Sequence, residues 1–91
     1  MLFLKSYFNF FLMEIQLTYY GVLTELAGRT SENIILEPGS DIAALELQLT
    51  QKYPDFGHYP LVFFSDQSIC GSDVQLSDKQ IVECMPPFAG G

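Results

Sequence analysis

The sequence predicts a single α+β domain in which one main helix packs on one face of a mixed β-sheet. Three observations lead to this fold class. Apolar and polar residues alternate over residues 13–20 and again over 80–85, which is the period of a half-buried strand. Between them, residues 42–53 carry apolar side chains three or four positions apart, the period of an amphipathic helix. A length of 91 residues leaves room for one core, so a second independent domain is not expected.

The first expected strand covers residues 13–20 and ends at Gly21. Apolar or aromatic residues occupy every second position, so one side of this strand is expected to face the core. The inward residues are Met13, Ile15, Leu17 and Tyr19. Residues 22–27 then have room for a short helix that Gly28 closes.

A second strand is expected at residues 33–36, and the turn formers Pro38-Gly39 separate it from the main helix. The Ser40 hydroxyl is expected to cap a free backbone amide, with the Asp41 carboxylate at the positive end of the helix dipole. Pro54 ends the helix, because the residue before a proline is pushed out of the helical region. The apolar stripe of this helix consists of Ile42, Leu45, Leu49 and Tyr53.

The chain is expected to return to the sheet in its second half. Residues 61–64 form a short apolar run that suits a central strand or one with a partner on its outer face, and residues 69–70 suit a brief further strand. In the last strand, residues 80–85, Val82 and Cys84 are expected to point inward. Its outward residues are Ile81, Glu83 and Met85. Two strands, a crossing helix and later strands that return to the same sheet make the β-grasp arrangement.

The composition is acidic, with eleven Asp and Glu against four Lys and Arg and a formal charge of -7. This charge repels phosphate backbones and anionic lipids, so neither a nucleic acid nor a membrane is an expected partner. It favours encounter with a basic protein.

Residues 1–12 differ in composition from residues 13–91, with four Phe and three Leu around a single Lys. At about 1.5 Å per residue they are too short to span a hydrocarbon core of roughly 30 Å. They also lack the small-residue cleavage site of a secretory signal. We expect Met13 to be the natural start, residues 1–12 to be a non-native or disordered extension, and residues 13–91 to form the one domain.

The interior of the sequence offers little catalytic chemistry. His58 is the only histidine and lies in an expected loop at residues 55–60. No nucleophile pattern surrounds it, so it is expected on the surface. No residues show the spacing of a metal site. Cys70 and Cys84 are expected as free thiols of a cytoplasmic protein, Cys84 inert because it points inward. A persulfide on the better exposed Cys70 is an alternative, although no cationic residue adjoins it in sequence.

The end of the sequence, MPPFAGG, carries the strongest functional signal. Two prolines fix φ near -65° and offer no amide donors, so residues 86–91 are expected to leave the sheet as an extended, flexible arm. Phe88 is an apolar anchor whose burial in a partner groove contributes on the order of 2 kcal/mol. Gly90 and Gly91 fit a channel too narrow for a Cβ atom. The residues expected to contact a partner are Pro86, Pro87, Phe88, Ala89 and Gly90.

A carboxylate at Gly91 does not react with nucleophiles at neutral pH, because its leaving group would be oxide. Adenylation by ATP would turn Gly91 into a mixed anhydride, and a sulfur donor could then displace AMP to leave a thiocarboxylate. This chemistry requires only a slim and unblocked C-terminus from this chain.

The predicted element order, the LSDKQIV segment at residues 76–82 and the final PPFAGG resemble the ubiquitin-like sulfur carriers of the MoaD/ThiS family, specifically the small subunits of molybdopterin synthase. The YYGVLTELAG segment at residues 19–28 is similar to the family's segment after the first strand. The resemblance covers residues 13–91. A terminal GG alone is a weak signal, whereas PPxxGG at the end of a short β-grasp chain is a specific one.

The resemblance implies that a ubiquitin-activating-type enzyme adenylates Gly91 with ATP and that Gly91 then receives sulfur as a thiocarboxylate. It further implies insertion into the large subunit of molybdopterin synthase, within a heterotetramer. There the sulfur would pass to a cyclic pyranopterin phosphate in molybdenum cofactor biosynthesis. The chain itself would be a carrier with no bound cofactor and no general base.

Three departures from the family pattern concern partner contacts: Ser65-Asp66-Gln67, Lys79-Gln80-Ile81 and Phe88. Two other functions stay open. A carrier of the thiazole pathway also ends in GG but is not expected to show the two prolines. A ubiquitin-like modifier or a binding module would either link Gly91 through an isopeptide bond or leave it unreacted.

Overall fold

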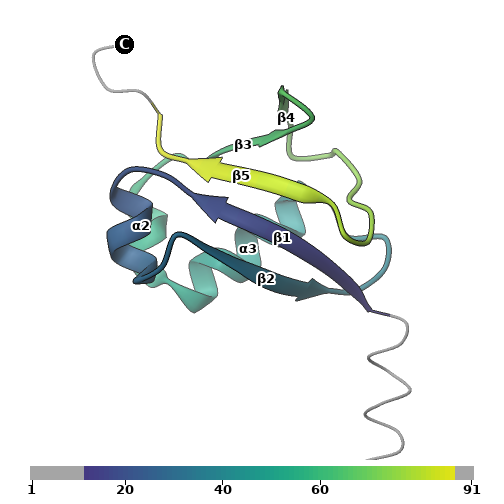
Figure 1. Cartoon of the computed structure of the whole chain (residues 1–91), viewed down its shortest axis with the longest axis horizontal. Coiled ribbons are helices and arrows are strands. Elements are labelled where there is room, and N and C mark those ends of the chain that lie inside the picture. Colours follow the sequence, from purple (N-terminus) through teal and green to yellow (C-terminus); the bar gives the residue numbers. More distant parts are fainter. Residues whose placement is uncertain (1–11, 88–91) are drawn as a thin grey trace, which may run out of the picture.

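The computed structural model describes residues 12–87, and the expectations about residues 1–11 and 88–91 therefore lie outside the described residues. Five strands form one sheet in the order β2-β1-β5-β3-β4 (Figure 1). The elements in chain order are β1 Met13–Tyr19, α2 Val22–Ala27, β2 Ser31–Leu36, α3 Ile42–Lys52, the 3₁₀ helix η1 Pro54–His58, β3 Val62–Ser65, β4 Ser68–Cys70 and β5 Ile81–Met85.

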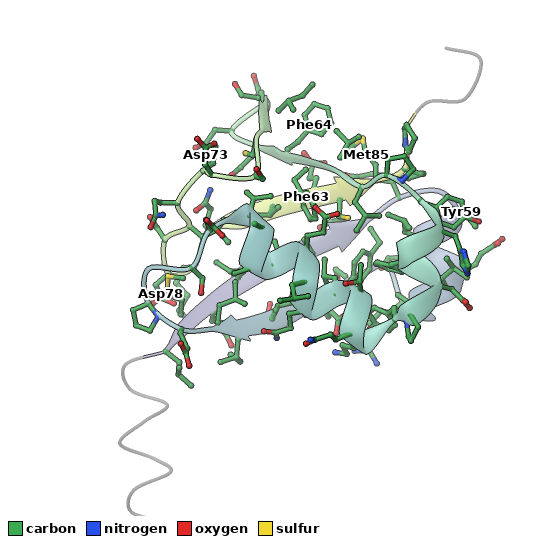
Figure 2. The ribbon with its side chains drawn as sticks, turned by 180° about the vertical axis from the view of Figure 1, so that it is seen from behind. Tyr59, Phe63, Phe64, Asp73, Asp78 and Met85 are labelled. Carbon is green, nitrogen blue, oxygen red and sulfur yellow. The ribbon has the colours of Figure 1, made fainter. Side chains whose placement is uncertain are left out.

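The sheet is mixed, because its central pair runs parallel while the other pairs run antiparallel. β1 pairs antiparallel with β2 and parallel with β5. β3 pairs antiparallel with both β5 and β4. α3 crosses one face of this sheet, as the views from opposite sides show (Figures 1 and 2). The predicted β-grasp fold is confirmed.

The core lies between the sheet and α3. Each predicted inward position of β1 is buried, as are Val82 and Cys84 of β5. Three of the four residues of the predicted helical stripe are buried, and the fourth, Tyr53, packs half-buried against them. The inward residues of β1, β5 and α3 meet here. Within residues 12–87, no helix lies over the other face of the sheet (Figures 1 and 2). We call that other face the open face.

Two local details differ from the sequence prediction. Asp41, rather than Ser40, caps α3, and its Oδ1 accepts a hydrogen bond from the Ala44 amide at 3.0 Å. The segment after Pro54, predicted as a loop, forms η1 and buries Phe56 completely. Phe56 packs against Tyr53 and Tyr19 with ring centroids 4.9 and 5.5 Å away, and this burial stabilises the short helix.

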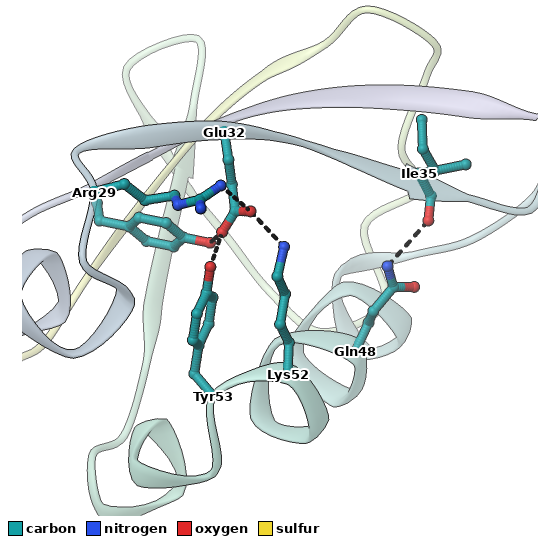
Figure 3. Close-up of polar contacts among 7 residues, drawn as sticks. Arg29, Glu32, Ile35, Gln48, Lys52 and Tyr53 are labelled. Atoms are coloured by element: carbon teal, nitrogen blue, oxygen red, sulfur yellow. Dashed lines mark hydrogen bonds and ion pairs between the residues drawn. The ribbon is translucent and has the colours of Figure 1, made fainter.

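A charged network joins β2, β1 and the C-terminal end of α3 at the end of the sheet from which β5 leaves (Figure 3). Its centre is the Glu32 side chain, only 5% exposed. Lys52 Nζ donates to Glu32 Oε1 at 2.5 Å, and the hydroxyls of Tyr53 and Tyr19 donate to Oε2. Arg29 lies 3.4 Å from Oε1. A carboxylate can be buried here because its oxygens have several charged or polar partners.

The network also fixes the ionisation of Glu32. Burial alone would raise the pKa of Glu32, but the hydrogen bonds from Lys52, Tyr19 and Tyr53 outweigh burial and lower that pKa below its ordinary value of 4.5. The folded state therefore binds this proton less readily than the unfolded chain. The resulting stabilisation is present above pH 4.5 and is lost as the pH falls through the folded-state pKa.

We expect Glu32→Gln to lower the free energy of unfolding at neutral pH by about 1–3 kcal/mol, because buried donors lose a charged acceptor. The difference between wild type and variant should shrink as the pH falls below 4.5. Urea denaturation at neutral pH and at a pH below 4.5 measures the free energy of unfolding of both proteins. Glu37→Gln is the matched control, since Glu37 is exposed and takes part in none of the ion pairs of residues 12–87. A constant difference at both pH values would contradict this account.

Candidate functional site

The candidate site is the end of β5 and the two prolines that follow it. β5 lies between β1 and β3, so its end is held on both sides. Of the predicted site residues, the structure describes Pro86, which is half-buried, and Pro87, which is exposed. Phe88, Ala89, Gly90 and Gly91 lie outside the described residues, and their roles stay predictions.

Gly21, at the turn between β1 and α2, lies beside Pro86. A Cβ atom added to Gly21 would come within 3.4 Å of Pro86 Cγ. Gly21 has φ 60° and ψ -138°, a conformation that side chains other than that of glycine rarely allow. The neighbouring Tyr20 amide donates to the Cys84 carbonyl at 3.1 Å. The first proline therefore leaves the sheet against a fixed turn, and no strand or helix includes Pro86 or Pro87.

An apolar patch covers the open face next to these prolines. Val62 lies opposite Met85 across β3 and β5, and Phe64 lies opposite Ile69 across β3 and β4. Ile69 and Ile81 are 68% and 61% exposed. We call Val62, Phe64, Ile69, Ile81 and Met85 the open-face patch; Phe64 and Met85 are labelled in Figure 2. Contiguous exposed apolar surface of this kind marks an interaction site.

Glu83 lies within this patch. It occupies the outward position of β5 between Ile81 and Met85, and its Cα pairs with that of Phe64 on the neighbouring strand. Its Oε2 accepts a hydrogen bond from the Tyr20 hydroxyl at 2.5 Å. This hydrogen bond raises the pKa of Tyr20, because ionisation would place a second negative charge beside the carboxylate. The patch is thus apolar with one negative group in its middle.

The half of the open face over β1 and β2 is more polar, although Ile35 of β2 is exposed. Gln16, Thr18, Ser31 and Asn33, together with Ile81 of β5, line a shallow hollow of about 390 Å³ there. The apolar half covers β3, β4 and β5 and the more polar half covers β1 and β2, so the boundary lies between β5 and β1. A partner that covers apolar surface would therefore lie over β3, β4 and β5, adjacent to Pro86 and Pro87.

The nucleophilic residues of the described chain are not arranged for catalysis. Cys84 is fully buried, and burial raises the pKa of its thiol to about 12, with the Glu46 carboxylate adding to the effect. The half-buried Cys70 has its Sγ 3.7 Å from the Ser68 carbonyl. His58 is exposed and lies 3.7 Å from Asp55. The predicted inert Cys84 and surface His58 are confirmed.

Residues 12–87 offer no metal site and no membrane span. They contain no cluster of three or more His, Cys, Asp or Glu side chains that could hold a metal ion. No helix among them is long and apolar enough to cross a membrane.

Sequence reasoning places Glu83 and Met85 outward but misses the Tyr20–Glu83 hydrogen bond. The two residues are 63 positions apart, and only the parallel register of β1 and β5 brings them together. The sequence gives one signal that could have pointed to Glu83: it is an acidic residue between two outward apolar residues of β5.

The chain is similar to known proteins in sequence and in structure. The model of the ThiS family matches residues 17–91. No curated protein is similar enough in sequence to count as a match.

Among solved structures, a protein of Pyrococcus furiosus assigned as molybdopterin converting factor, subunit 1, matches with a TM-score of 0.78 and 19% identity, over 84% of this chain and 99% of that one. Small archaeal modifier protein 1 of Haloferax volcanii matches with a TM-score of 0.75 and 9% identity, over 84% of this chain and 99% of that one. The protein of the same name from Methanosarcina acetivorans matches with a TM-score of 0.73 and 18% identity, over 88% of this chain and 98% of that one. These identities support the fold alone.

We expect Gly21→Ala to destabilise the domain by about 1–3 kcal/mol, because its backbone lies where a Cβ atom is strained, and to shift the environment of Pro86. Gly28→Ala is the control. Gly28 has φ 72° and ψ 22°, which alanine adopts at a smaller cost of about 1 kcal/mol, and nothing lies within 4 Å of a Cβ atom added there. Urea denaturation and the NMR shifts of Pro86 measure both effects. Equal costs for the two substitutions, with unchanged Pro86 shifts, would contradict this assignment.

Proposed function

The chain belongs to the ThiS family of ubiquitin-like sulfur carriers, and on this premise we propose that it carries sulfur as a thiocarboxylate on Gly91. We propose further that it is the small subunit of molybdopterin synthase. The observation that carries the proposal is the sequence PPFAGG directly after a strand held in the middle of the sheet, within a family match that extends to Gly91.

The proposed cycle begins with activation of Gly91. Its carboxylate attacks the α-phosphate of ATP on a ubiquitin-activating-type enzyme, which forms the acyl adenylate and releases pyrophosphate. Sulfur at the oxidation level of sulfide then attacks the acyl carbon and displaces AMP, which leaves a thiocarboxylate. If the donor is a persulfide, the first product is an acyl disulfide, and a thiol reduces its S–S bond to release the thiocarboxylate. The thiocarboxylate is a softer and better nucleophile than the carboxylate. The large synthase subunit would use it to deliver sulfur to a cyclic pyranopterin phosphate.

The described site fits a carrier that reacts inside another protein. Pro86 and Pro87 follow the strand without offering an amide donor, and Pro86 rests beside the Gly21 turn. The open-face patch lies next to these prolines, so a partner can hold the domain while residues 88–91 enter its active site. Binding on a rigid domain reduces the entropy cost of placing the reactive end. The partner would supply the basic residues that bind an anionic substrate, and an acidic carrier complements them.

A second candidate function is that of a protein modifier. The structural similarity to two small archaeal modifier proteins favours it. A modifier would use the same adenylate of Gly91, but a lysine amine of a target protein would displace AMP and form an isopeptide bond. The thiazole-pathway carrier is a weaker alternative, because the two prolines are not expected in it.

The test is the intact mass of the chain, prepared with Gly91 as the C-terminal residue, after incubation with its adenylating enzyme, ATP and a sulfur donor. We expect the mass increase that replacement of one oxygen by sulfur gives. Deletion of Gly91, or one extra residue after it, should abolish the increase without changing the fold. Transfer of that sulfur to the pyranopterin precursor by the large subunit would then support the molybdopterin role.

An unchanged mass, with the enzyme shown to be active on another carrier, would contradict the sulfur-carrier proposal. Adducts on other proteins that survive boiling and reductant, in the absence of the sulfur product, would favour the modifier.

A further inference from the structure

Glu83 is the one charged residue at the centre of the open-face patch within residues 12–87. Its neighbours along β5 are Ile81 and Met85, and its neighbour on β3 is Phe64. On its other side, the paired residue of β1 is the neutral Thr18. A carboxylate surrounded in this way keeps its hydration only as long as the patch is open to water.

The described part of the chain provides no cation for Glu83. Lys79 Nζ lies 2.6 Å from Glu14, at the other end of the sheet. Lys52 and Arg29 both pair with Glu32, on the opposite face. The hydrogen bond from the Tyr20 hydroxyl fixes the position of the Glu83 carboxylate but does not neutralise it.

A partner that covers the patch must therefore place a group beside Glu83 that compensates its negative charge. Burying an ionised carboxylate without a cation is costly, whereas a pair with good geometry offsets much of the loss of hydration. We propose that Glu83 determines the specificity of the open-face patch, and that the patch accepts a protein surface which is apolar around one arginine. This inference rests on the proposed function, because it names what the carrier's partners must present.

Arginine fits the described geometry better than lysine. Oε2 of Glu83 accepts from Tyr20, and Oε1 has no such partner among residues 12–87, so a planar guanidinium can approach the carboxylate edge with two donors. Phe64 is the paired residue of Glu83 on β3, and the Tyr20 hydroxyl donates to Glu83, so two aromatic residues are its neighbours. Aromatic faces attract a guanidinium as well.

The charge also disfavours other occupants of the patch. In a symmetric dimer formed through the patch, the two copies of Glu83 would lie near one another and repel. Anionic lipid headgroups and nucleic acids would be repelled both by Glu83 and by the net charge of -7.

The test compares two variants of Glu83 with matched variants of Glu37. Glu37 is exposed and follows Leu36, whose partner Met13 begins β1, so it lies at the end of the sheet away from Pro86. Glu83→Gln, Glu83→Lys, Glu37→Gln and Glu37→Lys are made in the chain that ends at Gly91. For each, calorimetry measures the Kd for the adenylating enzyme of the source organism without nucleotide. The rate of adenylation with ATP then gives KM and kcat.

We expect the Kd and KM to rise about tenfold for Glu83→Gln and about hundredfold for Glu83→Lys, with kcat little changed. The Glu37 variants carry the same charge changes away from the patch, and they should change Kd by less than about twofold. Tyr20→Phe should raise Kd by about threefold, because Glu83 loses the group that positions it. Urea denaturation of each variant confirms that the domain stays folded.

Equal effects of the Glu83 and Glu37 variants would overturn the inference, since net charge alone would then explain them. Unchanged binding by Glu83→Gln, or an absence of binding by the wild-type chain, would overturn it too. The proposed function is judged separately by the sulfur product. A wild-type chain that gains sulfur while Glu83→Lys binds equally well leaves the carrier proposal standing and removes this inference.

Discussion

The parallel pairing of β1 with β5 is the constraint on which the rest of this domain depends. It joins residues near the two ends of the described part of the chain, with Gln16 opposite Ile81 and Tyr19 opposite Cys84. The Asp78 carboxylate accepts from the Glu14 amide at 2.8 Å, so the register is fixed at the start of the pair as well. A parallel pair needs a long crossover, and here the crossover contains α3, which covers the core.

This pairing decides where β5 ends and where the two prolines begin. Because β5 runs beside β1 in the same direction, it ends at the turn that contains Gly21, and Pro86 rests there. The Glu32 network holds the same end of the domain on the opposite face, through Tyr19 of β1 and Tyr53 after α3. The two faces thus have different roles. One face contains the core and the Glu32 network, and the open face carries the patch that we propose as the partner surface.

Much of this arrangement can be predicted from local sequence. Period-two alternation identifies the buried side of β1 and of β5, and the stripe from Ile42 to Leu49 identifies the buried side of α3. The predicted cap of α3 is one residue early because Ser40 and Asp41 are both good caps, and backbone geometry selects between them. The 3₁₀ helix η1 escapes prediction because Phe56 packs on Tyr19, which is far away in the sequence, as well as on the nearby Tyr53.

The long-range polar contacts are beyond sequence reasoning for the same reason. The contact of Glu32 with Lys52 spans 20 positions and that of Tyr20 with Glu83 spans 63, so neither leaves a periodic signal. The proposed chemistry of Gly91, in contrast, does not depend on long-range contacts. Composition and residue order alone predict it, and the fold contributes the frame beside which that chemistry is proposed to occur.

In the proposed function, Gly91 transfers sulfur and does not join the chain to other proteins. The most direct measurement is the mass of the C-terminal peptide from protein isolated from its native source, without base or reductant treatment. We expect a fraction of the free chain to carry sulfur in place of one carboxylate oxygen at Gly91. The proposed function would be contradicted if Gly91 were found only as a free carboxylate or in isopeptide bonds to lysines of other proteins.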